Sequence, residues 1–235
     1  MNTEQKRDFH VGMVIFDAMT SLDYAAPREV FARMPGAQVH VVSKNGAPVR
    51  TDIGFVEVAT LSLSETPKLD LLFSGGGEGV NALMRDDEIL NFLSTRGAEA
   101  QWVTSVCTGS VVLGAAGLLD GYRATSHWSA MEVLPLFGAK PVHERVVVDR
   151  NRITGGGVTA GLDFALVVTA KLHGEEVAQA AQLAMEYDPQ PPFDVGTPRT
   201  APPALLEKVA KQMSASTRTK MEIASGFKRR TSAEI

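Results

Sequence analysis

Residues 101–121 read QWVTSVCTGSVVLGAAGLLDG, and they say most about the architecture. The apolar, β-branched segment 102–106 predicts a strand, and Cys107 follows it directly. Three small residues, Thr108, Gly109 and Ser110, then open a segment with helical apolar spacing. A sharp turn with small neighbours, where strand and helix backbones approach closely, is typical of a nucleophile elbow. We therefore predict that Cys107 occupies a strained turn at the carboxyl end of a central strand.

The flanking sequence predicts an α/β fold. Short apolar, β-branched runs predict three further strands, at residues 11–16, 38–43 and 69–73. Helical spacing occurs between them, at residues 26–34, with Pro27 in the first turn, and at residues 80–93. Strands that alternate with helices form a parallel sheet sandwiched by helices. Two segments with central polar turns predict hairpins added at a sheet edge, at residues 49–61 and 145–154.

The C-terminal part of the chain predicts an extension to this domain. Residues 160–187 have a helical pattern with a break near Gly174, and residues 190–203 contain five prolines, which predicts an extended strap. Apolar residues return at helical spacing from Ala204 to Phe227. We divide the chain into an α/β domain, residues 1–188, and a strap with a C-terminal helix, residues 189–235. We expect this helix to pack on a second copy of the chain.

Composition excludes several classes of protein. With 44% hydrophobic and 21% charged residues and no long uninterrupted apolar run, the chain has no expected membrane span. The net charge of −4 is spread along the sequence and gives no surface suited to nucleic acid. The basic cluster at residues 228–230 is interpreted as a solvated tail. A single cysteine excludes an intramolecular disulfide, and the N-terminus lacks a leader pattern, so we expect a cytoplasmic protein.

Cys107 is the candidate nucleophile. At the start of a helix, unpaired N–H groups and the helix dipole favour the thiolate, so we expect the pKa of this thiol to fall. The alternative is that a lone cysteine is simply a small buried hydrophobic residue. The strand, turn and helix around Cys107 favour the nucleophile.

A second glycine-rich turn, at residues 74–79, follows the strand predicted at 69–73. Phosphate binding is one interpretation, but neither the P-loop pattern nor the dinucleotide fingerprint is present. Loops that leave the carboxyl ends of parallel strands meet at one edge of the sheet. We therefore predict that backbone N–H groups of Gly76 and Gly77 support the site beside Cys107.

Acid–base candidates are few. Asp23 precedes the first predicted helix and could be a cap or a site carboxylate, with Glu29 as the competing carboxylate. His127 lies 20 residues after Cys107 and is a candidate base for a Cys/His pair. The other histidines lack ligand spacing and are interpreted as structural: His10, His40, His143 and His173. We expect no metal site, because neither H-x-x-x-H nor H-E-x-x-H occurs.

Several motifs together resemble a known family. They are LDYAAPREVF (22–31), DLLFSGGGEGV (70–80), VCTGSVVLGAAGLLDGYRATSHW (106–128), HERVVVDRNRITGGGVTAGLDFAL (143–166) and EYDPQPPFDVGTPRTAP (186–202). This set resembles the PfpI-type superfamily, which has a glutamine-amidotransferase-like, flavodoxin-related fold. Within it, the chain looks like the bacterial isocyanide hydratases.

The resemblance implies a homodimeric lyase without a cofactor that adds water to an isocyanide, R–N≡C, and forms an N-substituted formamide. Position by position, it places the nucleophile on Cys107, the partner carboxylate on Asp23 and a site neighbour on Thr108. Cys107 would form a thioimidate, and Asp23 would give and take the proton if a nearby thiolate raised its pKa. His127 would then be a structural neighbour.

Two other classes stay open. One is a sister enzyme of the superfamily, a glyoxalase, deglycase or peptidase, which usually has a Glu near the Cys and a His after the elbow. The other is a non-enzymatic sensor, either a regulator's amidotransferase-like domain or a redox sensor with an oxidisable Cys107.

Overall fold

A seven-stranded sheet forms the centre of the molecule. The computed structural model describes residues 8–233, with side chains through residue 227. The sheet strands are β1 (Phe9–Val14), β2 (Ala37–Ser43), β5 (Leu61–Ser62), β6 (Leu71–Ser74), β7 (Trp102–Val106), β10 (Val146–Asp149) and β11 (Arg152–Gly155). Their order in space is β10, β11, β7, β6, β1, β2, β5. Neighbouring strands are parallel except for β10 and β11, which confirms the predicted parallel architecture.

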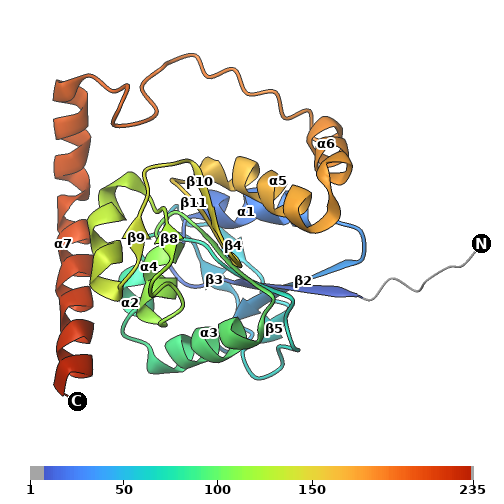
Figure 1. Cartoon of the computed structure of the whole chain (residues 1–235), viewed down its shortest axis with the longest axis horizontal. Helices are drawn as coiled ribbons and strands as arrows, with labels where there is room; N and C mark the ends of the chain where they lie inside the picture. The colour runs from blue at the N-terminus through green and yellow to red at the C-terminus, as the bar shows by residue number, and fades with distance from the viewer. Residues whose placement is uncertain (1–7, 234–235) are drawn as a thin grey trace, which may run out of the picture.

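Helices cover both faces of this sheet (Figure 1). On one face α1 (Ser21–Phe31) packs against α5 (Ala160–His173), which also carries α6 (Glu175–Ala184). On the other face α4 (Gly109–Ala115) packs against β6 and β7. Three elements contact α4 there: α2 (Val80–Leu83), α3 (Asp87–Glu99) and the 3-10 helix η1 (Trp128–Phe137).

Three buried phenylalanines join α1 and α5 to the sheet. Phe31 of α1, Phe73 of β6 and Phe164 of α5 are each fully buried. Their ring centroids lie 5.9 to 6.2 Å apart, and two of the three pairs are edge-to-face, an arrangement that aromatic rings prefer. This cluster holds α1, and hence the Asp23 on its first turn, against the sheet.

The predicted strands and helices agree closely with the structure at the centre and less closely at their ends. Residues 102–106 form β7 as predicted, whereas β1 begins two residues before the predicted 11–16. The predicted helical segment 80–93 contains α2 and the first half of α3. Asp86 starts α3, because its side chain accepts the N–H groups of Glu88 and Ile89 at 3.1 and 3.3 Å.

The first helix begins earlier than predicted. It starts at Ser21, so Pro27 is its seventh residue and the prediction that Pro27 lies in the first turn is wrong. The proline ring has no N–H for the carbonyl of Asp23, one turn earlier. Pro27 is nevertheless buried against α5, where a β-carbon on Gly161 would lie 3.1 Å from the proline ring. Tertiary packing therefore overrides the local preference of proline for a helix start.

Both predicted hairpins form, in different ways. β10 and β11 pair at the edge of the main sheet, and β11 continues it by pairing parallel to β7. By contrast, β3 (Val49–Arg50) and β4 (Val56–Glu57) form a separate two-stranded sheet, so the predicted edge position is wrong for this hairpin. A further small parallel pair is formed by β8 (Arg123–Ala124) and β9 (Lys140–Pro141).

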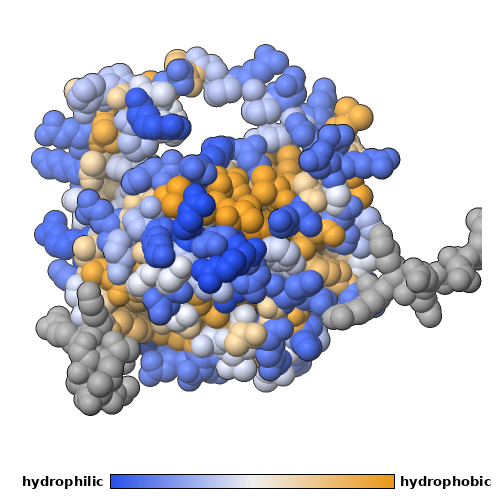
Figure 2. All heavy atoms as spheres, viewed as in Figure 1, coloured by the Kyte–Doolittle hydropathy of each residue, from blue (hydrophilic) through white to orange (hydrophobic). Residues whose placement is uncertain are grey.

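A long exposed strap follows the domain. The helical pattern breaks at Gly174, as predicted, where a φ of 93° separates α5 from α6. Residues 188–200 are all exposed, and the strap crosses from α6 to α7 (Pro203–Ala233) clear of the body (Figure 1). Figure 2 shows open space between this strap and the domain.

The C-terminal helix α7 packs against η1 and α2 of its own chain. Ile223 and Ala224 are buried there, and the ring of Phe227 contacts that of Phe137. These contacts correct the expectation that the helix packs on a second copy in place of its own domain. Participation of α7 in a dimer remains a prediction. So does the division of the chain into residues 1–188 and 189–235. The basic cluster 228–230 has side chains outside the described residues.

Candidate active site

Three adjacent strands bring the candidate residues to one edge of the sheet. β1 leads to α1 and Asp23, β6 leads to the turn 74–79, and β7 ends at Cys107. Because β1, β6 and β7 are parallel neighbours, the loops after them meet. The structure therefore unites Asp23, Gly76, Gly77, Thr108 and Cys107, as the sequence predicted.

The backbone at Cys107 is strained. Its φ is 57°, a left-handed value that costs a non-glycine residue about 1–3 kcal/mol. The Cys107 N–H donates to the carbonyls of Gly155 and Gly156, at 3.1 and 2.8 Å. Its carbonyl accepts hydrogen bonds from the hydroxyls of Ser126, at 3.0 Å, and Ser110, at 3.2 Å. The predicted elbow is confirmed, and these contacts hold the backbone that carries the sulfur.

Glycines are required where the turn 74–79 and the elbow at Cys107 approach each other. A β-carbon on Gly109 would lie 2.2 Å from the carbonyl oxygen of Ser74 and 2.7 Å from that of Gly75. A β-carbon on Gly76 would lie 2.5 Å from Thr108 N and 3.0 Å from Asp23 Oδ2. Side chains at either position would separate the turn 74–79 from the elbow.

The backbone N–H groups of the glycine-rich turn are engaged within the site. Gly76 N–H donates to Asp23 Oδ2 at 2.9 Å, and Gly77 N–H donates to Thr108 Oγ1 at 3.0 Å. In this structure the two donors therefore orient Asp23 and Thr108. Their direct support of a substrate stays a prediction.

Asp23 is a buried carboxyl with a strongly raised pKa. Burial is the main cause, a weaker effect of Asp52 adds to it, and hydrogen bonding to Cys107 and to Gly76 N–H opposes it, so the pKa is about 7 instead of 3.8. The second carboxyl oxygen, Asp23 Oδ1, is buried, and no donor among the described residues reaches it with the distance and angle of a hydrogen bond. The predicted direction is confirmed, but its cause is burial and not a nearby thiolate.

The pKa of the Cys107 thiol is raised well above its usual value, which contradicts the prediction that it falls. Burial is the largest cause, and the charge of Asp23 acts in the same direction, while hydrogen bonds from Thr108 oppose both. Asp23 and Cys107 therefore titrate as a coupled pair that loses its first proton near neutral pH.

This raised pKa makes Asp23 costly for stability at alkaline pH. The folded protein holds the Asp23 proton up to about pH 7, whereas the unfolded chain releases it near 3.8. The cost is absent below 3.8, grows as pH rises and reaches about 4 kcal/mol above 7. We expect Asp23→Asn to be more stable than the parent protein in urea at pH 8, and this gain to shrink by about 2–3 kcal/mol at pH 5.

The matched control is Glu29→Gln on the same helix, since Glu29 is exposed and pairs with Arg33 at 2.8 Å. Glu29→Gln should change the free energy of unfolding by no more than about 1 kcal/mol at either pH. An Asp23→Asn gain that is the same at pH 5 and pH 8 would show that the Asp23 carboxyl is not held protonated by the fold.

His127 is hydrogen-bonded within its own loop. Its Nδ1 lies 2.8 Å from the Ser129 hydroxyl and accepts the Ser129 N–H at 3.3 Å, so the neutral ring carries its proton on Nε2. Burial lowers the pKa of His127, and the charge of Lys220 lowers it further. No hydrogen bond joins His127 and Cys107 within the described residues. These contacts favour a structural role.

The remaining titratable candidates lie elsewhere. Glu29 is exposed and paired with Arg33, so it is not part of the site. His10 and His40 stack with ring nitrogens 2.9 Å apart, and His173 contacts the ring of Phe9.

A groove of about 720 Å³ lies between η1 and α7. It is lined in part by His143, and its lining includes neither Cys107 nor Asp23. Within the described residues, no group of three or more His, Cys, Asp or Glu could hold a metal ion.

Several groups that build the site were not predicted. The carbonyls of Gly155 and Gly156 and the hydroxyl of Ser126 hold the elbow, and all three lie in motifs that carried the family resemblance. Lys220 of α7 lies near Cys107, and nothing in the sequence pattern marked it.

The comparisons with known proteins agree with this arrangement. Residues 10–171 match the DJ-1/PfpI family, and the chain belongs to that family. The isonitrile hydratase of Pseudomonas putida is 46% identical to this chain over 213 residues, which are 91% of this chain and 93% of that protein. A crystal structure of a THiJ/PfpI family protein from Pseudomonas syringae is 42% identical and covers 95% of this chain and 96% of its own, with a TM-score of 0.91.

More distant relatives share less of the chain. Drosophila melanogaster DJ-1beta, 22% identical, covers 76% of this chain and 98% of its own with a TM-score of 0.70, and this shows the fold alone. The HTH-type transcriptional regulator GbdR of Pseudomonas aeruginosa is 27% identical over 76% of this chain and only 50% of the regulator. No helix in the described part of the chain is long and apolar enough to cross a membrane.

Proposed function

We propose that this protein is a hydro-lyase that converts isocyanides, also called isonitriles, into N-substituted formamides. The observation that carries the proposal is the pair of Cys107 and Asp23, a buried thiol beside a buried carboxyl whose pKa is about 7. The identity to an isonitrile hydratase across 91% of the chain supports it.

The first step uses both members of the pair. With one proton between them, the proton can reside on Asp23 while Cys107 is the thiolate. The Cys107 sulfur attacks the terminal isocyanide carbon, and that carbon takes the Asp23 proton. The products are a thioimidate, Cys107–S–CH=N–R, and the Asp23 carboxylate. Hydrogen bonds from Thr108 to the sulfur favour the thiolate that this step needs.

The second step returns the pair to its starting state. The Asp23 carboxylate takes a proton from water as the water oxygen adds to the thioimidate carbon, and then delivers that proton to nitrogen. The tetrahedral intermediate loses its hydroxyl proton to Asp23, the carbon–sulfur bond breaks, and the formamide leaves. Cys107 is again a thiolate and Asp23 is again protonated, so water is the sole co-reactant and no cofactor takes part.

A carboxyl with a pKa near 7 suits this double role, because it is a competent acid and a competent base at neutral pH. A sister enzyme that acts on glyoxals or peptides would usually pair the cysteine with a Glu and a His. Here Asp23 faces the thiol, and His127 Nδ1 is bound to Ser129. These contacts favour the hydratase over the sister enzyme.

The test is a direct assay of the purified protein. It is mixed with a simple aromatic or alkyl isocyanide, and the formamide is followed by NMR, with methylglyoxal as the rival substrate in a parallel sample. We expect catalytic formation of formamide and no turnover of methylglyoxal. Turnover of methylglyoxal alone would support the sister enzyme, and no turnover of either substrate would favour the sensor.

We also propose a cytoplasmic homodimer. Large apolar side chains are exposed on the β3–β4 hairpin and on the strap, among them Ile53 (69%), Phe55 (61%) and Phe193 (75%). Figure 2 shows further apolar surface over α5 and β10, below the strap. Surfaces of this kind are typical of protein interfaces. Sedimentation at micromolar concentration should give twice the mass of the chain, and a monomer would contradict the proposal.

A further inference from the structure

The C-terminal helix places a buried lysine beside the candidate active site. Lys220 is only 4% exposed, whereas lysines are almost always on the surface unless they are paired. It lies on the same face of α7 as the buried Ile223 and Ala224, three and four residues further on. That face packs against the domain, and Thr217 Oγ1 donates to the carbonyl of Ser129 at 3.1 Å.

A hydrogen-bonded chain holds this lysine in place. Lys220 Nζ donates to the Ser216 hydroxyl, one turn earlier on α7. Ser216 Oγ in turn donates to Glu78 Oε2 at 2.7 Å. Glu78 belongs to the same glycine-rich turn that orients Asp23 and Thr108 through Gly76 and Gly77. The helix and the site are therefore connected through side chains with defined partners.

The charge of Lys220 acts on the site. Burial lowers the pKa of Lys220, while the charges of Glu78 and Cys107 oppose this decrease. On the other side, Lys220 lowers the pKa of His127. Three charged or titratable groups therefore interact electrostatically with Lys220: Glu78, Cys107 and His127. Asp23 interacts in turn with Cys107.

We propose that Lys220 is a positioning residue whose ammonium group stabilises the negative charge of the Cys107–Asp23 pair, which makes the C-terminal helix part of the active site. A positive partner would favour ionisation of the pair, because burial disfavours its charged forms. A nearby cation compensates for lost hydration. The catalytic consequence rests on the proposed function, whereas the effect on the thiol does not.

The similarity to isonitrile hydratase includes part of the C-terminal helix. The similarity to isonitrile hydratase covers 213 residues, and only 202 residues precede α7, so it reaches into that helix. The DJ-1 structures from Drosophila melanogaster and Schizosaccharomyces pombe cover 75–76% of the chain.

The test measures the ionisation of Cys107 without a substrate. Because the chain has one cysteine, the ultraviolet absorbance of its thiolate, taken as a difference from the Cys107→Ala protein, reports this residue alone. We expect Lys220→Met to raise the midpoint of Cys107 ionisation by about one pH unit, a tenfold smaller ionisation constant. Lys220→Gln, which also removes the charge, should shift it in the same direction.

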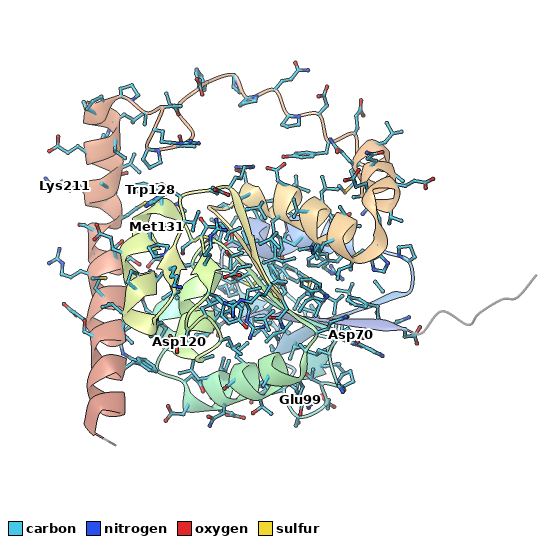
Figure 3. All side chains as sticks on the ribbon, viewed as in Figure 1. Asp70, Glu99, Asp120, Trp128, Met131 and Lys211 are labelled. Carbon is cyan, nitrogen blue, oxygen red and sulfur yellow. The ribbon has the colours of Figure 1, made fainter. Side chains whose placement is uncertain are left out.

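The matched control is Lys211→Met, which removes a lysine that is exposed on the same helix. Figure 3 shows Lys211 on α7 and Trp128 and Met131 on the neighbouring η1. This control should leave the midpoint unchanged. A midpoint in Lys220→Met and Lys220→Gln that equals that of the parent protein overturns the proposal, whichever substrate the enzyme takes. If the midpoint shifts as expected but no isocyanide is hydrated, the proposal holds and the proposed function fails.

Discussion

Replacing Cys107 by alanine is expected to abolish isocyanide hydration, with a decrease in kcat of at least about 10⁴-fold. The sulfur forms the bond to the isocyanide carbon, and the hydroxyls of Ser110 and Ser126 are committed to the Cys107 carbonyl. Alanine keeps a β-carbon at a φ of 57°, so the backbone strain is unchanged and the fold should persist. The assay follows formamide by NMR, and thermal unfolding checks the fold.

Cys107→Ser is the sharper variant, because it keeps an atom that can form hydrogen bonds in place of the sulfur. It should be nearly as inactive as Cys107→Ala, since an alcohol beside Asp23 has far too high a pKa to ionise. Serine activity within about tenfold of the parent protein would mean that the reaction needs no thiolate, and the covalent route would have to be abandoned.

Replacing Asp23 by asparagine is expected to lower kcat by about 10²–10⁴-fold, the usual contribution of a positioned acid or base. Asparagine retains an oxygen that can accept the Gly76 N–H now bound to Asp23 Oδ2, so the site geometry should survive. The lost function is proton delivery to the isocyanide carbon and removal of a proton from water. Rates and thermal unfolding of the same preparations separate a chemical loss from unfolding.

The comparison variant is His127→Ala, because His127 is the other residue that could move protons. It should keep activity within about threefold, since its Nδ1 is bound to Ser129. Full activity in Asp23→Asn, or an inactive but folded His127→Ala, would assign the acid–base role to histidine and revive the Cys/His alternative.

Much of the fold could be predicted because local patterns and tertiary structure agree there. β7 and the turn at Cys107 were predicted to the residue, since the β-branched run, the cysteine and the small residues all indicate one structure. The meeting of Asp23 with Cys107 followed from topology, because loops after adjacent parallel strands share an edge.

The rest depends on contacts between distant parts of the chain. Pro27 lies inside α1, because packing against α5 outweighs the local preference of proline. The contacts of α7 with η1 could not be predicted, because an amphipathic pattern shows that a face is buried but not against which partner.

Ionisation was the least predictable property of the site. A cysteine at the start of a helix indicates a lowered pKa, but the burial of Cys107 and the nearby Asp23 raise it. Lys220, which we propose as the compensating charge, lies more than 100 residues away in the sequence, where nothing distinguishes it from the other lysines. Burial and charge of this kind emerge only once the whole chain is folded.

The pH dependence of kcat/KM tests the central claim most directly, that Cys107 and Asp23 react as a pair that shares one proton. Below pH 7 both groups are protonated and no nucleophile is present. With an isocyanide substrate, kcat/KM should therefore rise through an apparent pKa of about 7 in the parent protein and in His127→Ala alike. An acid limb that disappears or moves in His127→Ala, or a rate that falls as the pH rises through 7, would contradict the account.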